Sequence, residues 1–139
     1  MPAAGDTDDP EDPDVNDNSL VFRLVHGRFA ILFTGDIGIA TEEELVSAPA
    51  SLGCTVLKVP HHGSRHSSSA PFLDASSPAI ALIGAGYRNS FRLPARETLV
   101  ALKGRGIRVW RTDLDGTVRI TSDGGGGTPL VEGLCGHFH

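Results

Sequence analysis

Short apolar runs separated by turn residues divide the chain into pieces of strand length and helix length. Runs rich in β-branched, aromatic and aliphatic residues predict strands, and they cover residues 19–25, 29–34, 54–59, 78–83, 107–111 and 117–121. Three further segments predict helices, at residues 41–48, 71–75 and 94–105. The order is a hairpin, then alternating strands and helices, then a closing strand pair. This order predicts an α/β fold with an α+β-like mixed sheet.

Local signals support two of the helices and mark an irregular tail. Thr41 and Glu44 form a capping box, and the acidic residues 42–44 suit the positive end of a helix dipole. We therefore expect these acids to cap their own helix and not to catalyse. In the helix at 94–105, Ala95, Leu99 and Leu102 recur on one face. Four consecutive glycines open the tail, residues 124–139, which we expect to be irregular.

Two of the apolar runs stop abruptly at side chains that commonly bind metal. One run ends at Thr34-Gly35-Asp36, and the other ends at Pro60-His61-His62-Gly63-Ser64. Buried strands that deliver such groups at their carboxyl ends often build the active site of an α/β protein. Carboxylates suit divalent cations, and imidazole suits zinc or iron. The motifs together predict a metal site with Asp36 and one of the two histidines, because neighbouring side chains on an extended backbone point apart.

Small residues follow the histidine pair. Gly63 and Ser64 would let the chain turn closely around a metal or an anion. Serines 67–69 precede a predicted helix with Pro71 in its first turn, and a helix N-terminus favours phosphate. Gly63, Ser64 and Ser67 are therefore candidate substrate-binding residues.

Other candidate motifs are weaker. The segment Gly84-Ala85-Gly86 follows a strand but lacks the third glycine of a dinucleotide-binding fingerprint. Ser64 lies near His66, but no Gly-x-Ser-x-Gly elbow of a serine hydrolase surrounds it. His26 stands in a turn, where we expect it to face solvent. The two histidines of the tail leave a weak metal-binding pair open.

Composition and charge indicate one globular domain with an acidic start. The 139 residues suffice for one core, and no apolar run nears the roughly 20 residues that span a bilayer. The net charge of −5 conceals an asymmetry, because residues 1–17 hold seven acids and no Lys or Arg. We expect residues 1–17 to be a disordered arm without a signal peptide, and residues 18–123 to be the folded domain. Cys54 and Cys135 make no disulfide framework.

Four motifs resemble, in order, the C-terminal metallo-β-lactamase-like domain of the ComEC-type competence proteins, which are bacterial DNA-uptake channel proteins. The resemblance covers residues 16–123, and its motifs are Asn18–Val21, Leu32–Asp36, Leu57–Ser64 with Ser67–Ser69, and Gly106–Asp113 with Asp115-Gly116. It implies an αββα sandwich that carries two divalent metal ions, zinc or manganese.

The resemblance also implies roles for the site residues. Asp36 would be the metal-bridging carboxylate. His62 would be a late histidine ligand, because the segment 60–63 is similar to the Pro-Gly-His-Gly ending of the wider superfamily. His61 would then lie behind it, although either histidine remains a candidate metal ligand. The implied chemistry is metal-assisted phosphodiester hydrolysis with Asp36 and His62 as catalytic residues, used as a nuclease on the non-transported DNA strand.

Two departures limit what the chain is expected to do alone. The family's first half carries a His-x-His-x-Asp-His motif and a further histidine, and nothing here matches either. Leu93 also stands where relatives often have the first histidine of His-Pro-His. The chain therefore resembles only the second half of the domain. We expect it to bind metal weakly and to be inactive alone.

The resemblance implies three partners: DNA, the missing half of the domain and a membrane channel protein. A related full-length protein would hold this domain outside the cytoplasmic membrane, whereas a standalone chain without an export signal would be cytoplasmic. The alternative from another class is a non-catalytic interaction module that retains the fold.

Overall fold

Five strands form the main sheet of the protein, in the spatial order β1-β2-β3-β4-β5. The computed structural model describes residues 19–48, 51–86 and 89–134. Strands β1 and β2 form an antiparallel hairpin, and each later neighbour pairs in parallel. Their bounds are β1 Phe22–His26, β2 Phe29–Phe33, β3 Val56–Lys58, β4 Ile80–Ile83 and β5 Arg108–Arg111. The predicted mixed sheet of an α/β protein is confirmed.

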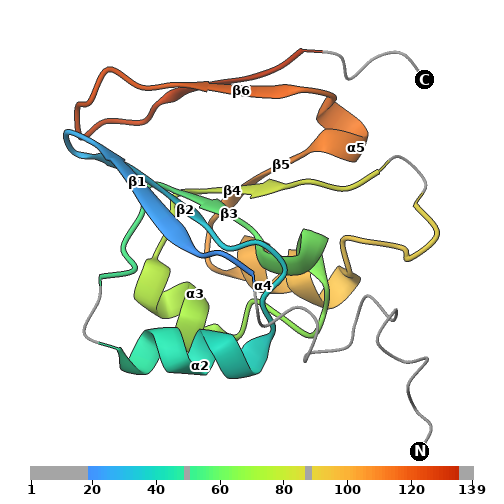
Figure 1. Cartoon of the computed structure of the whole chain (residues 1–139). Helices are drawn as coiled ribbons and strands as arrows, with labels where there is room; N and C mark the ends of the chain where they lie inside the picture. The colour runs from blue at the N-terminus through green and yellow to red at the C-terminus, as the bar shows by residue number, and fades with distance from the viewer. Residues whose placement is uncertain (1–18, 49–50, 87–88, 135–139) are drawn as a thin grey trace, which may run out of the picture.

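Helices cover one face of this sheet and a two-stranded sheet covers the other (Figure 1). The helices are α2 (Ile39–Ser47), α3 (Ala70–Ser76) and α4 (Arg96–Gly104), all near their predicted positions. On the opposite face lie α5 (Thr112–Asp115), β6 (Val118–Thr121) and β7 (Leu130–Gly133). A parallel sheet with both faces covered needs strands that are apolar on both sides. The predicted strands supply this pattern.

Alternate residues of the central strands enter two separate clusters. On β3, Leu57 joins the helix-side core with Phe72 and Leu102, and all three are fully buried. The preceding residue, Val56, joins a smaller cluster with Phe29 and Ile80 that packs against partly buried side chains of β5, β6 and β7. The period of two in a strand explains this division. Burial of the third predicted strand on both faces is confirmed.

The predicted pairing of the last two strands is wrong. Strand β5 pairs with β4, and β6 pairs with β7 in a second antiparallel sheet. One helical turn, α5, separates β5 from β6. There the Asp115 carboxylate accepts the Arg111 amide proton at 2.9 Å, and Asp113 pairs with the Arg111 guanidinium. These local bonds close a turn on the backbone itself, so the chain leaves the main sheet instead of folding back along it.

The tail predicted as irregular contains strand β7. Its Val131 packs against the cluster of Phe29, Val56 and Ile80, which gives the segment a buried face. The four glycines before it hid this strand from the sequence pattern. The acidic arm at residues 1–17 and the tail residues 135–139 lie outside the described residues. Within the part of the chain that is described, no helix has the length and apolar character to cross a membrane.

Candidate metal centre at the ends of strands β2 and β3

The loops after β2 and β3 leave the sheet at one edge. The two strands are parallel neighbours, with Phe33 opposite Lys58 in the register, so their carboxyl ends coincide. Asp36 follows β2 and His62 follows β3. His62 Nε2 lies 3.4 Å from Asp36 Oδ1, and both side chains are about half exposed, at 50% and 43%. The structure thus brings together the pair singled out in the sequence.

The backbone at the histidines is not extended, which corrects the premise used to separate their side chains. His61 and His62 have φ values of 53° and 54° within a short 3₁₀ segment, Pro60–Gly63. Both therefore adopt left-handed conformations that L-residues rarely take. The His61 amide donates to the Gly35 carbonyl at 2.9 Å, which ties this segment to the Asp36 loop. His61 is 4% exposed, whereas His62 faces solvent.

A hydrogen bond on the far side of the ring orients His62. Its Nδ1 lies 2.6 Å from the Gly84 carbonyl oxygen. A carbonyl oxygen only accepts, so this contact assigns the proton to Nδ1. In a neutral imidazole Nε2 is then an unprotonated acceptor, 3.4 Å from a carboxylate oxygen of Asp36. Two acceptors at this distance repel unless a proton or a metal cation lies between them.

Lys58 places a cation at the same edge of the sheet. Burial lowers the pKa of its ammonium group, and the negative charge of Asp36 opposes that shift. A Cβ added at Gly84 would lie 3.3 Å from Lys58 Nζ, so the ammonium lies against the strand end that holds His62. Sequence reasoning gave Lys58 no role. Lys58 is the last residue of a buried strand, and this position alone could have marked it as a residue near the site.

The three candidate substrate-binding residues lie beneath the surface. Gly63, Ser64 and Ser67 are all buried. Ser67 Oγ donates to the Ile37 carbonyl at 2.9 Å, and Ser64 Oγ accepts the His66 amide proton at 3.1 Å. These hydroxyls therefore brace the loops around the site. Contact of the three residues with a substrate stays a prediction.

Glu42 has a different role from the one predicted. Helix α2 begins at Ile39 with Gly38 as its N-cap, ahead of the expected cap at Thr41. Glu42 is fully buried, and its carboxylate accepts the amide protons of Ser68 at 2.5 Å and Ser69 at 2.8 Å. Burial raises the pKa of the Glu42 carboxyl, and the two amide bonds oppose that shift. The acid thus holds the loop before α3 and does not cap its own helix.

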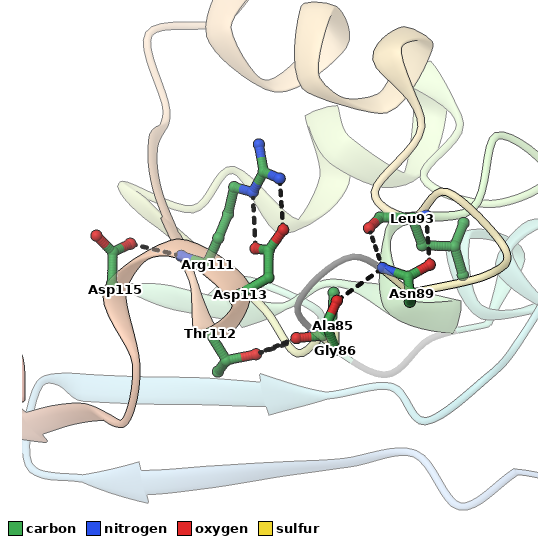
Figure 2. A network of polar contacts seen from close by, with 8 residues as sticks. All are labelled: Ala85, Gly86, Asn89, Leu93, Arg111, Thr112, Asp113 and Asp115. Atoms are coloured by element: carbon green, nitrogen blue, oxygen red, sulfur yellow. Dashed lines mark hydrogen bonds and ion pairs between the residues drawn. The ribbon is translucent and has the colours of Figure 1, made fainter. Parts of the chain in front are cut away.

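A pocket of about 420 Å³ opens beside His62. Its walls are residues 84–86, residues of the loop at 89–93, and Thr112. Asn89 closes this loop on itself, since its Nδ2 donates to the carbonyls of Gly86 and Leu93 and its Oδ1 accepts the Leu93 amide proton (Figure 2). Thr112 Oγ1 exchanges two hydrogen bonds of 2.9 Å with the Ala85 backbone. No pattern in the sequence indicated this pocket.

Asp36 and His62 fit a metal in donor type but not in number. Across residues 19–48, 51–86 and 89–134, no three His, Cys, Asp or Glu side chains group closely enough to hold one ion. Structural and catalytic zinc sites use at least three protein ligands. The described residues therefore provide no more than two of the donors that such a site needs.

No model of a known protein family matches the chain. It is 40% identical over 114 residues to Competence protein ComA of Neisseria gonorrhoeae, covering 81% of this chain and 16% of that protein. It is 36% identical over 113 residues to ComE operon protein 3 of Bacillus subtilis, covering 79% of this chain and 15% of the relative. These similarities support a relationship between this chain and the ComEC-type competence family.

Recombination protein 2 of Haemophilus influenzae is a more distant relative, 30% identical over 105 residues, which cover 76% of this chain and 13% of that protein. The chain thus spans about a sixth or less of the length of these relatives.

Proposed function

We propose that this chain is one half of a metallo-β-lactamase-like hydrolase domain within a ComEC-type competence protein. In this proposal Asp36 and His62 supply two ligands of a two-metal site, and the remaining ligands come from another segment. The substrate is a DNA phosphodiester, and the chain is inactive alone. A bound cation would supply an activated water and would stabilise the charge that develops on the phosphate.

The observation that carries this proposal is the close approach of two groups that can bind metal, His62 Nε2 and Asp36 Oδ1, at 3.4 Å. Two ligands about 2.1 Å from a tetrahedral zinc ion lie about 3.4 Å apart. The bond from His62 Nδ1 to a backbone carbonyl is also the usual outer contact of a metal-binding histidine, because it fixes the tautomer and the ring. Both features support a ligand role for this pair.

Residues next to the pair position it and add a positive charge nearby. The Asp36 amide donates to Ser19 Oγ at 3.0 Å, and Thr34 Oγ1 donates to the Lys58 carbonyl at 2.5 Å, so both strand ends are tied down. The Lys58 ammonium would attract an anionic phosphate. One observation favours the alternative, a non-catalytic interaction module: the described residues contribute only two metal donors that meet.

We expect substoichiometric Mn²⁺ to broaden amide NMR signals of residues 34–37 and 60–64 in the full chain. Asp36→Ala and His62→Ala should each require at least about tenfold more Mn²⁺ for the same effect, because a lost ligand costs at least as much as a lost outer contact. Asp74→Ala and His26→Ala are matched controls, since both residues are exposed. Asp74 lies in α3, and His26 pairs with Phe29 at the start of β2, the end of that strand away from Asp36.

The site-specific readout matters because the seven acids of residues 1–17 also attract cations. Broadening of amide signals only at those acids would contradict the proposal. Equal Mn²⁺ sensitivity in the unmodified chain and both ligand variants would do the same.

A further inference from the structure

The pocket beside His62 has an apolar wall that opens toward the candidate metal site. His62 contributes to its lining, so the ring that faces Asp36 also borders the pocket. Phe91 and Leu93 supply the apolar surface, and Phe91 is 60% exposed. An exposed phenylalanine beside a concave site offers a flat face for stacking. The pocket volume of about 420 Å³ is within the usual range for small ligands.

Among the described residues that line the pocket, Asn89 and Thr112 are already engaged with the backbone. Both N–H groups of the Asn89 amide bond to carbonyls, and the Thr112 hydroxyl donates to Ala85 (Figure 2). These bonds fix two walls of the pocket, formed by segments 84–86 and 89–93. They also leave these two side chains with no N–H or O–H donor for a ligand. Such a pocket binds by shape and stacking instead of by reading hydrogen-bonding edges.

Two basic residues neighbour residues that line the pocket. Lys58 Nζ lies against Gly84, which lines the pocket. Arg92 stands between Phe91 and Leu93 in the chain and is exposed. Arg111, in contrast, is neutralised by Asp113 at 2.6 Å. A flat apolar group with an anion next to it would match this arrangement.

We propose that this pocket binds one nucleobase of single-stranded DNA, stacked on Phe91, with the adjoining phosphate toward Lys58 and His62. The inference rests on the proposed function, because that function supplies a phosphodiester at His62. Aromatic stacking beside basic groups is the usual way to hold single strands without sequence preference. A base in a duplex would first have to leave its stack, at a cost in free energy. The pocket therefore selects single strands.

The test is the affinity of the full chain for a fluorescein-labelled dT12 oligonucleotide, measured by anisotropy in low salt with EDTA. A 12-unit abasic oligomer with the same phosphates is the matched probe. We expect dT12 to bind at least about fivefold more tightly, because stacking contributes about 1–3 kcal/mol per base. Phe91→Ala should bring the affinity ratio close to one, and Phe91→Trp should preserve it.

Two variants separate stacking from charge and from general damage. Val100→Ala removes an apolar side chain of similar exposure, 61%, on α4 and should leave the ratio unchanged. Lys58→Gln should weaken both probes to a similar extent, because phosphate contacts are common to both. Equal affinity for both probes, a ratio that survives Phe91→Ala, duplex DNA competing as well as dT12, or no binding of either probe would each overturn the inference.

The oligonucleotide experiment and the Mn²⁺ experiment test the two proposals separately. EDTA removes metal from the binding assay, so a base preference can appear even if Asp36 and His62 bind no cation. In that case the proposed hydrolase function fails and the base pocket stands. Mn²⁺ broadening at residues 34–37 and 60–64 without a base preference gives the opposite result.

Discussion

Replacing Glu42 with glutamine is expected to lower the free energy of unfolding by about 2–3 kcal/mol at pH 7. The two carboxylate oxygens accept one amide proton each, from Ser68 and Ser69. Glutamine keeps one acceptor and turns an NH₂ group toward the other amide, which leaves a buried donor without an acceptor. Urea denaturation followed by circular dichroism measures the change. Glu43→Gln, at an exposed neighbour on α2, should shift it by less than about 0.5 kcal/mol.

The stability difference between the unmodified chain and Glu42→Gln should also depend on pH. Burial raises the folded-state pKa of Glu42 above its ordinary 4.5. A raised pKa means that the folded state binds the proton more tightly, so this contribution to stability is fully present below pH 4.5 and is lost as the pH rises through the raised value. The stability difference between the unmodified chain and Glu42→Gln should therefore grow as the pH falls. A difference that shrinks toward low pH would contradict the assignment.

Gly63→Ala is the second change with a large expected effect. Gly63 has φ of +85°, and a Cβ there would lie 2.5 Å from Pro94 Cβ and 3.1 Å from Pro94 Cα. The left-handed backbone costs a non-glycine residue about 1–2 kcal/mol, and overpacking adds about 1–3 kcal/mol. We expect a loss of about 3 kcal/mol, visible as a lower thermal unfolding midpoint.

Gly127→Ala is the matched control, because an added Cβ there meets nothing within 4 Å. It should leave the midpoint nearly unchanged. The comparison also separates two roles for Gly63. If the glycine serves only a substrate, Gly63→Ala will unfold at the same temperature as the unmodified chain, and the packing argument is wrong.

Continuous apolar runs carried most of what the sequence could predict. Strands β2 and β3 are buried on both faces, so their runs stand out without knowledge of their partners. The pairing of Asp36 with His62 was predictable for the same reason, since each residue follows such a run. Parallel neighbours end at one edge of a sheet, and chain order alone made these two strands plausible neighbours.

Long-range and conformational features could not be predicted in this way. Glu42 bonds to amides 26 and 27 residues away. The local pattern predicted that this acid caps its own helix, and that prediction was wrong. Strand β7 became visible only through its packing on β6 and on the cluster around Val56. The pocket wall at Phe91 depends on the Asn89 bonds that close its loop. Each of these features depends on contacts that the local sequence pattern does not indicate.

If His62 binds metal as proposed, the consecutive left-handed conformations of His61 and His62 set the stability of this segment against its chemistry. Each costs a non-glycine residue about 1–2 kcal/mol, and both lie in the segment that positions the ring beside Asp36. Glycine or asparagine would fit this backbone more easily. A library of this chain selected only for heat resistance should therefore accumulate these residues at positions 61 and 62. The most stable members would be those that had lost the imidazole facing Asp36, a compromise that any thermostabilised version of this segment must confront.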